Sequence, residues 1–402
     1  KSLTNRPDLW GHYGIAREIA TIVNRPLKPL EVEDLNQYRE LEKLAIDVAV
    51  ENEENPLCLR YSAMRVENVT KRQASWKVKT RLYYCGMRSI NLLADMTNYI
   101  MMELGQPMHA FDQRVVDSVG VRTLPEATKF TTLDGQERDL DKGTLMIWHK
   151  DTPVAIAGVM GGLQSEIEDD TTKLFLESAN FDAVQIRKTA AKLDLRTDAA
   201  AHYEKTLDPE LCELAIARFI KLLRDEDKDI TVTSSFSDVY VKKYPHITIH
   251  IDKPFIDRAI GKVLSMEEIT RTLTNLKYDI KVDGDNITIE VPTFRATKDV
   301  SQKADIIEEI ARIHGYDNIT PESNLWKIAP VEKDPARELE YSSKELLATK
   351  YGASEIHSYV WYNTELNQEL GIKTRDNLKI TNGIVRLDNT LRHEMAPTML
   401  YA

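Results

Sequence analysis

Hydrophobic residues recur at helical spacing over residues 92–104, and this is the clearest pattern in the chain. The apolar positions are three or four residues apart and therefore share one face of a helix: Leu93, Met96, Ile100 and Leu104. Gly105 favours the left-handed conformation that ends helices, and Pro107 cannot continue one. The pattern predicts a helix that stops at Gly105 and an extended segment over residues 108–112.

The chain around this helix alternates between strand-like and helix-like patterns. The predicted elements are a helix through Ile15, Ile19 and Val23, a strand over residues 57–63, strand pairs within residues 120–180, a strand over residues 173–179, and helices over residues 182–225. Asp134-Gly135 lies between apolar runs, as hairpin turns do. Glu177 interrupts an apolar strand, and because an unpaired buried charge is costly, it needs a partner or a function.

The second part of the chain predicts a small α+β domain. Its predicted elements are a strand over residues 247–251, a helix over residues 266–276, a hairpin that turns at residues 283–286, and a helix over residues 303–314. Ser265 and Glu268 have the spacing of a helix-capping box. Beyond this domain, the pattern predicts a helix over residues 339–351 and a strand over residues 356–361.

Length and charge distribution indicate a multidomain α+β protein. A chain of 402 residues fits about two to four domains. The expected divisions are residues 1–30 as a connecting helix of a preceding domain, 31–225 as a mixed β-sheet module with packed helices, 226–245 as a linker, 246–320 as the small domain, and 321–402 as the truncated start of an α/β domain. Because the chain begins at Lys1 and ends at Ala402 inside an apolar pattern, we expect a piece of a longer protein.

Composition excludes several classes of protein. The formal net charge of -11 argues against coating by nucleic acid, and no apolar run is long enough to span a bilayer. Three cysteines without a CxxC pair fit a reducing, cytoplasmic location and argue against a thiolate zinc site. The sequence has no Walker-type loop, no GxSxG motif and no HExxH motif, so generic nucleotide-binding or hydrolase functions have no support.

One basic stretch stands out in this acidic chain. No acidic residue occurs between Glu67 and Asp95, and the segment carries Lys71, Arg72, Lys77, Lys79, Arg81 and Arg88. The cations alternate with Trp76, Tyr83 and Tyr84, which is a composition that binds phosphates and stacks on bases. The alternative is a solvated face with ordinary core aromatics.

The sequence contains further residues with candidate chemistry, each with a structural alternative. His109 is a candidate catalytic residue or a hydrogen-bonded structural histidine, and Glu177 is a functional carboxylate or half of an ion pair. A carboxylate cluster, which suits a hard cation such as Mg²⁺ or forms a solvated polar face, comprises Asp299, Asp305, Glu308 and Glu309.

Longer motifs resemble one known family. Residues 86–91, 95–99, 103–112, 157–162, 176–179, 196–199 and 203–204 resemble the B3/B4 editing module of the bacterial-type phenylalanyl-tRNA synthetase beta subunit, and residues 292–295, 299, 304–312 and 315–319 resemble its B5 domain. Residues 1–30 are similar to part of its B1 domain, and residues 321–402 to the start of its class II synthetase-like B6/B7 domain. The resemblance runs in order over nearly the whole chain.

The resemblance implies a function. The family's beta subunit pairs with a catalytic alpha subunit as an alpha2beta2 assembly, which uses ATP to join phenylalanine to tRNA(Phe), and the B3/B4 module hydrolyses tyrosine attached by mistake. ATP is not expected to bind this chain. The editing-site positions carried over are Arg88, Thr97, Asn98 and His109 as the catalytic set, and Glu177, Gly158, Gly161, Thr197 and Ala199 as the substrate-binding set. The resemblance assigns the carboxylate cluster to a Mg²⁺ shared with the alpha subunit.

Physical chemistry explains why such an editing site is needed. A hydrophobic pocket for phenylalanine rejects tyrosine only about a hundredfold, whereas a site that hydrogen-bonds the hydroxyl can refuse phenylalanine by a factor of order 10⁴. We therefore expect Glu177 to select tyrosine. Arg88 and His109 are expected to hold the RNA 3′ end or the ester and orient water, and backbone amides near Gly158 and Gly161 to polarise the carbonyl.

The sequence departs from the family at Ala200, His202, Lys205 and Thr206, where serine, arginine, arginine and glycine are usual. A second interpretation is therefore a non-catalytic tRNA-docking and assembly scaffold with a weakened editing site. A third, DNA binding by residues 246–319, is disfavoured by the acidic helix there, and neither DNA nor a membrane is an expected partner.

Overall fold

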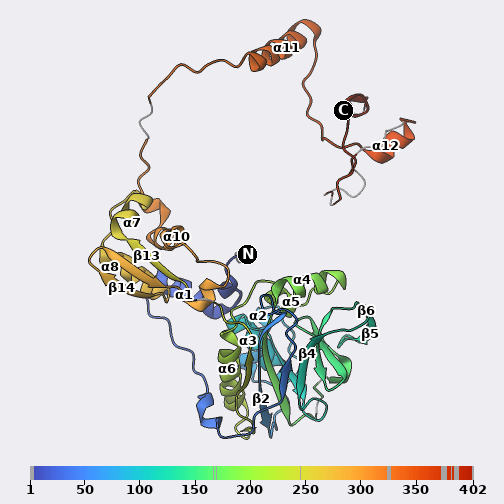
Figure 1. Cartoon of the computed structure of the whole chain (residues 1–402), viewed down its shortest axis with the longest axis vertical. Helices are drawn as coiled ribbons and strands as arrows, with labels where there is room; N and C mark the ends of the chain where they lie inside the picture. The colour runs from blue at the N-terminus through green and yellow to red at the C-terminus, as the bar shows by residue number, and fades with distance from the viewer. Residues whose placement is uncertain are drawn as a thin grey trace. The chain divides into compact units, whose positions relative to one another are not determined.

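The computed structural model describes residues 4–165, 167–168, 170–244, 246–323, 327–372, 378–381, 383 and 389–400. Lys1, Pro245 and Ala402, which enter the sequence predictions, lie outside the described residues. The chain divides into two compact units, Lys1–Pro321 and Glu322–Ala402, and each is described by itself (Figure 1).

The first unit is of the α+β class, as predicted. Its helices are α1 His12–Ile22, α2 Trp76–Tyr84, α3 Leu92–Leu104, α4 Ala183–Lys192, α5 Asp198–Tyr203, α6 Leu211–Glu226, α7 Lys253–Ile260, α8 Met266–Asn275, α9 Thr293–Ala296 and α10 Lys303–His314. Its strands are β1 Ile46–Val48, β2 Cys58–Glu67, β3 Met108–Asp112, β4 Val119–Thr123, β5 Thr128–Thr131, β6 Glu137–Leu140, β7 Leu145–His149, β8 Thr152–Ile156, β9 Met160–Gly161, β10 Leu174–Phe181, β11 Thr231–Val232, β12 Ser237–Tyr240, β13 Thr248–Asp252, β14 Asp279–Asp283 and β15 Asn286–Glu290.

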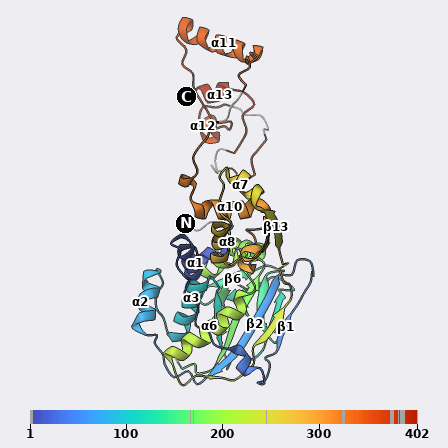
Figure 2. The ribbon, with the colours of Figure 1, turned by 90° about the vertical axis from the view of Figure 1, so that its left-hand side faces the viewer.

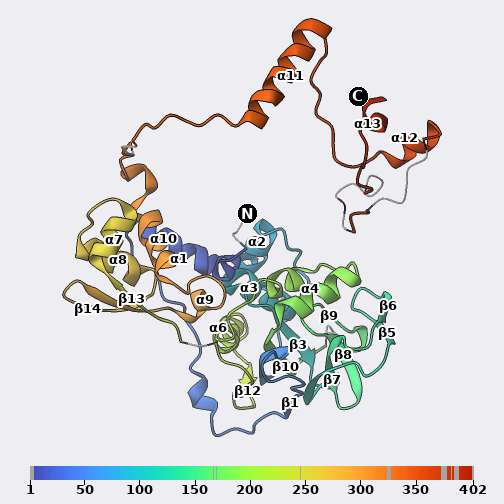
Figure 3. The same ribbon diagram turned by 45° about the horizontal axis from the view of Figure 1, so that its top comes forward.

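Two five-stranded sheets form the larger part of this unit. One has the order β1-β4-β7-β8-β9, and the other runs β11-β2-β10-β3, with β12 also paired to β2. Strands β3 and β10 lie side by side in Figure 3 and pair antiparallel. Strands β11 and β12 fall within the expected linker at residues 226–245, so that part of the prediction is wrong. The reason is that the edge of β2 accepts both segments into its ladder.

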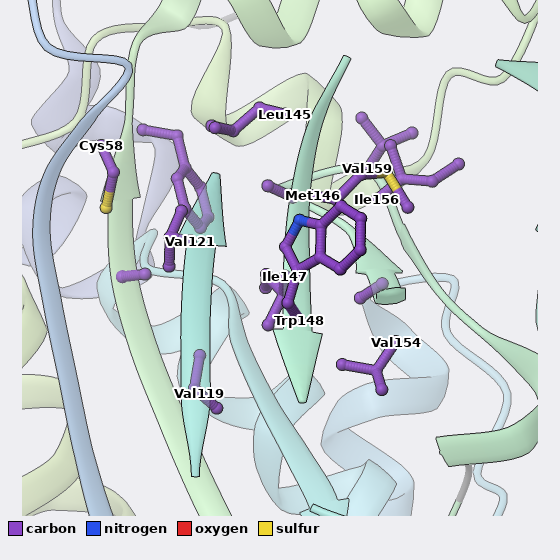
Figure 4. Packing of buried hydrophobic residues seen from close by; sticks show 14 of the residues in the cluster. Cys58, Val119, Val121, Leu145, Met146, Ile147, Trp148, Val154, Ile156 and Val159 are labelled. Carbon is purple, nitrogen blue, oxygen red and sulfur yellow. The ribbon is translucent and has the colours of Figure 1, made fainter. Parts of the chain in front are cut away.

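The sheet containing β2 and β10 separates two hydrophobic cores, because successive residues of a strand face opposite sides. Tyr61 and Phe175 face the first core, which packs against the other sheet and includes Trp148 (Figure 4). Met64 and Leu176 face the second core, which α3 and α6 cover (Figure 2). This sheet is therefore buried on both faces, which places Glu177 in the interior.

Helix α3 confirms the opening prediction and positions the segment that follows it. Its side-chain cap is Asn91, which accepts a hydrogen bond from the Ala94 amide at 2.9 Å. Gly105 ends the helix with φ of 82°, in the left-handed region that glycine tolerates. The predicted apolar face is buried throughout, and the chain leaves as β3, so the helix holds β3 in a fixed place.

The small α+β domain also forms as predicted. Strands β13, β15 and β14 make a three-stranded sheet, and α7, α8 and α10 supply apolar residues to the same core. The Ser265 side chain accepts a hydrogen bond from the Glu268 amide at 3.1 Å, which opens α8. Helix α10 has the predicted bounds.

The second unit contains α11 Pro335–Tyr351, α12 Thr364–Glu369 and α13 Ala396–Leu400. The predicted helix over residues 339–351 lies within α11, but the predicted strand over residues 356–361 is wrong. Only an isolated bridge between Trp361 and Leu391 occurs there among the described residues, so the segment has no neighbouring strand to complete a ladder. In the described part of the chain, no helix has the length and apolar character needed to cross a membrane.

Candidate functional site

Five of the predicted site residues line one small cavity. The cavity of about 80 Å³ lies between β3, β8, β10 and α5, and the predicted residues in its wall are His109, Gly158, Gly161, Glu177 and Ala199. These residues are up to 90 positions apart in the sequence, so the fold rather than local sequence brings them together.

Glu177 is the buried acid of this cavity. It is 4% exposed, and its Oε2 accepts a hydrogen bond from the Tyr61 hydroxyl on β2. Burial raises the pKa of the Glu177 carboxyl to about 7, although the Tyr61 hydrogen bond acts in the opposite direction. The carboxyl group is therefore about half protonated near neutral pH and can both donate and accept a hydrogen bond.

His109 faces Glu177 across the β3–β10 ladder, because the two residues are register partners. Its ring packs edge-on against Phe111, with ring centroids 4.3 Å apart. Burial lowers the pKa of His109 to about 4, so the imidazole is neutral at physiological pH. Its Nε2 is buried without a hydrogen-bond partner. A buried polar atom of this kind destabilises the fold unless a ligand or a water molecule forms a hydrogen bond with it.

Two glycines of the cavity wall leave space that a side chain would fill. Gly158 has φ of 66°, and a Cβ there would lie 2.9 Å from Ile186 Cδ1. A Cβ at Gly161 would lie 3.1 Å from His109 Cε1. Glycine is therefore required at residue 158 both by the backbone conformation and by packing, whereas a side chain at residue 161 would require Leu133 or the histidine ring to shift by a few tenths of an ångström.

A second cavity of about 310 Å³ adjoins the first and shares Pro107, Met108 and Ala199 with it. The remaining predicted residues in its wall are Thr97, Asn98 and Thr197. Thr197 caps α5 and donates a hydrogen bond from its hydroxyl to the Val159 carbonyl oxygen at 2.8 Å. This bond ties the start of α5 to the segment that carries Gly158 and Gly161.

Arg88 does not join the other predicted residues. Its side chain is exposed, and it lines neither cavity, although the preceding residue Met87 lines the second one. The structure therefore brings eight of the nine predicted editing-site residues into two adjoining cavities.

Sequence reasoning assigned no role to three residues that support the cavity, although Gln106 and Tyr203 lie in the family-like motifs. Tyr61 bonds Glu177, while Tyr203 donates a hydrogen bond from its hydroxyl to the Ala179 carbonyl oxygen at 3.1 Å. Gln106 donates to the same oxygen at 2.8 Å. Tyr61 occupies an inward position of a predicted strand, where the pattern indicates an apolar core residue. Its hydrogen bond to Glu177 follows only from the pairing of β2 with β10.

The positions that are expected to differ from the family lie on α5 and directly after it. Ala200 is buried, and the His202 Nδ1 lies 2.7 Å from the Asp198 carbonyl oxygen. Lys205 forms an ion pair with Glu204 at 2.7 Å. Thr206 has φ of 62°, a conformation that is uncommon for a β-branched residue and natural for glycine.

The predicted metal residues are engaged with other groups. Glu309, 3% exposed, accepts hydrogen bonds from Arg295 at 2.7 Å and from Arg312 at 2.6 Å. Burial alone would raise the pKa of Glu309, but the two arginines lower it to about 2. Asp299 accepts a hydrogen bond from Arg295 at 2.5 Å.

The other two carboxylates lie in different surroundings. Asp305 accepts from the backbone amides of Ser301 and Gln302, which caps α10, and Glu308 is exposed. No group of three or more His, Cys, Asp or Glu residues is placed to hold a metal ion in the described ranges. The donor set as it lies does not fit a Mg²⁺ ion, and the assignment of Mg²⁺ to these residues stays a prediction.

Two family models match successive parts of the chain. The family model of the B3/4 domain matches residues 57–227, and that of the tRNA synthetase B5 domain matches residues 249–316. A solved structure, an N-terminal fragment of the phenylalanyl-tRNA synthetase beta-subunit from Pyrococcus horikoshii, is 14% identical with a TM-score of 0.42, covering 78% of this chain and 85% of that chain.

Curated relatives match the chain over much or all of its length. The phenylalanine–tRNA ligase beta subunit of Solibacter usitatus is 34% identical over 99% of this chain and 51% of its own length. The Clostridium acetobutylicum protein of the same name is 38% identical over 79% of this chain and 39% of its own length. The Leptospira biflexa protein of that name is 31% identical over 100% of this chain and 50% of its own length. The chain thus spans about half the length, or less, of these relatives. With both domain models in order and relatives aligned along it, the chain belongs to the family of phenylalanine–tRNA ligase beta subunits.

Proposed function

We propose that this chain is the portion of a phenylalanine–tRNA ligase beta subunit that hydrolyses the ester of tyrosine wrongly attached to tRNA(Phe). The whole enzyme would join phenylalanine to the tRNA with an alpha subunit, and this portion would bind the tRNA and remove the error. The observation that carries the proposal is the pairing of buried Glu177 with His109, whose Nε2 has no partner, on one cavity wall.

Glu177 would recognise the substrate side chain. Its carboxyl group, with a pKa of about 7, can hydrogen-bond a phenolic hydroxyl, and burial makes that bond selective. Phenylalanine would leave the carboxyl without this partner and would meet the desolvation cost of an unsatisfied polar group. The site would therefore prefer tyrosine, opposite to a purely hydrophobic pocket.

His109 would position the reacting end. A neutral imidazole whose Nε2 lacks a partner can accept a hydrogen bond from water or from a ribose hydroxyl, or donate one to the ester, depending on its tautomer. With its pKa near 4, the imidazole is a weak base, so it would orient the water or the ester rather than act as a general base. Backbone amides near Gly158 and Gly161 would polarise the carbonyl, and a positioned water would attack.

Thr97, Asn98 and Thr197 would hold the RNA end in the second cavity, which opens beside the first. Arg88, exposed next to Met87, would contact RNA outside the cavities rather than the ester. The B5 domain would face the alpha subunit, and a Mg²⁺ ion held there by Asp299 and Glu309 would have to replace the arginine partners of both carboxylates.

The test is tyrosine release from Tyr-tRNA(Phe) by the 402-residue chain and by its His109→Ala variant. The proposal expects release above the spontaneous rate for the wild type and loss of most of it in the variant, about 10²-fold as for a positioned catalytic group. A wild-type chain that binds the tRNA but releases tyrosine at the spontaneous rate would support the scaffold interpretation, which the substitutions at residues 200–206 motivate.

A further inference from the structure

Helix α2 turns its aromatic side chains to solvent. Val78 and Leu82 face inward and are buried, whereas Trp76, Tyr83 and Tyr84 are 83%, 76% and 83% exposed. The helix packs beside α3 at the edge of the unit (Figure 2). The alternative of ordinary core aromatics is therefore wrong, because core residues would be covered. Three large aromatics on one short helix form an unusual exposed surface.

The same segment is positively charged without internal compensation. Among the described residues, none of its cations takes part in an ion pair: Lys71, Arg72, Lys77, Lys79, Arg81 and Arg88. Lys79 instead lies over the Trp76 ring, with Nζ 5.7 Å from the centroid. Two acids contact the start of the segment: Glu226 accepts a hydrogen bond from the Ser75 hydroxyl at 2.6 Å, and Asp227 accepts one from the Lys71 backbone amide at 2.8 Å. In a chain of net charge -11, this positive surface fits a polyanion.

A cavity of about 380 Å³ opens beside this surface, between α1, α2 and α3. Its wall is mainly apolar and includes Leu82, Tyr84 and Met102, together with Glu103, whose carboxylate is paired with Arg218. Arg81 lies at its edge, with its guanidinium 5.9 Å from the centroid of the Tyr99 ring, to whose hydroxyl it also donates a hydrogen bond. A cavity of this size, with aromatic walls and a cation at its edge, suits a flat aromatic group such as an unstacked base.

We propose that α2 and this cavity form a binding surface for single-stranded RNA. Trp76, Tyr83 and Tyr84 stack on bases, the lysines contact phosphates, and the cavity takes one base. Cations that alternate with exposed aromatics favour this occupant over a protein partner, because each base offers a stacking face and each phosphate a charge. The surface continues through residues 85–86 to Met87, which lines the second site cavity.

The first measurement is the affinity of the 402-residue chain for a short fluorescein-labelled oligoadenylate, by fluorescence anisotropy. Trp76→Ala and Tyr83→Ala should each weaken binding about tenfold, as expected for the loss of one stacked base. Lys77→Ala should weaken binding and reduce the slope of log affinity against log salt by about 0.7. Tyr316→Ala, which removes an aromatic side chain that is 62% exposed in the small domain, is the matched control and should change nothing.

The second measurement uses Cys85, the exposed thiol in the cavity wall, since Cys58 and Cys212 are buried. Bound oligoadenylate should slow alkylation of Cys85 severalfold in the wild type and have little effect in Trp76→Ala. Both measurements use RNA that carries no amino acid, so they do not depend on the proposed hydrolysis. Unchanged RNA affinity in both aromatic variants would overturn the proposal. If the two variants also lost binding to the alpha subunit, the surface would be a protein interface instead.

Discussion

Glu177 and His109 lie opposite each other on β10 and β3, and burial has moved their pKa values past each other. The carboxyl has a pKa of about 7 and the imidazole a pKa of about 4, so both groups are neutral between these values. An exposed pair of these residues would instead be ionised at pH 5 to 6. The site is therefore prepared for hydrogen bonding rather than for a standing ion pair.

This arrangement predicts a specific pH dependence for Glu177→Gln. The pKa of Glu177 is raised from 4.5 to about 7 on folding, so its contribution to stability is present below pH 4.5 and is lost as the pH rises through 7. As the pH rises from 4.5 to 8, the difference in unfolding free energy between variant and wild type should shift in favour of the variant by on the order of 2 to 3 kcal/mol. Urea unfolding at both pH values measures this, and a pH-independent difference would contradict the assigned pKa.

Gly158→Ala should destabilise the chain by about 2 to 4 kcal/mol. It combines a positive φ with a Cβ 2.9 Å from Ile186 Cδ1 and 3.1 Å from Tyr203 Cδ2. Gly135→Ala is the matched control, because Gly135 has φ of 74° and open space around it. Thermal unfolding should show a loss of only about 1 kcal/mol in the control. Equal losses would show that packing at Gly158 contributes nothing.

Thr206→Gly should stabilise the chain by about 0.5 to 1 kcal/mol. The glycine relieves the strain of a β-branched residue at φ of 62°, and this gain exceeds the added entropy of the unfolded chain. The same change at the exposed strand residue Thr131 should instead destabilise. A destabilised Thr206→Gly in chemical denaturation would refute the claim of strain.

Glu309→Gln should destabilise the chain by about 3 to 5 kcal/mol, because Arg295 and Arg312 would lose their buried carboxylate partner. The pKa of Glu309 lies at about 2, below its unfolded value of 4.5, so its contribution holds above pH 4.5 and is lost as the pH falls toward 2. Glu308→Gln, one residue earlier and exposed, should change stability by less than about 0.5 kcal/mol in the same urea titration. Similar effects of the two changes would mean that Glu309 is not the central acid of this network.

Sequence patterns predicted what is local and periodic. The helix at residues 92–104, its glycine end and the helix at residues 303–314 follow from apolar spacing and end signals, and the structure has them at these bounds. Strands β11 and β12 were missed because both are short and become strands only by pairing with β2, which is distant in the sequence. The predicted strand at residues 356–361 failed for the converse reason, since it has no neighbouring strand.

For the candidate site, the resemblance selected residues that the fold then brings together. Arg88 is the exception, because its side chain is exposed and lines neither cavity. Tyr61 and Arg295 could not be found from spacing, since their bonds to Glu177 and Glu309 join segments that only the folded chain makes adjacent. Arg312, three residues after Glu309 on α10, is a local partner that helical spacing does allow.

The central claim is that Glu177 selects tyrosine, and the ratio of release rates from Tyr-tRNA(Phe) and Phe-tRNA(Phe) tests it most directly. Asp208→Asn, at another buried carboxyl outside the cavity, is the control and should keep the wild-type ratio. In Glu177→Ala, with folding verified by thermal unfolding, the account predicts that the preference for tyrosine falls at least tenfold toward equal rates, as for a lost buried hydrogen bond. A wild-type ratio retained by Glu177→Ala would contradict the account.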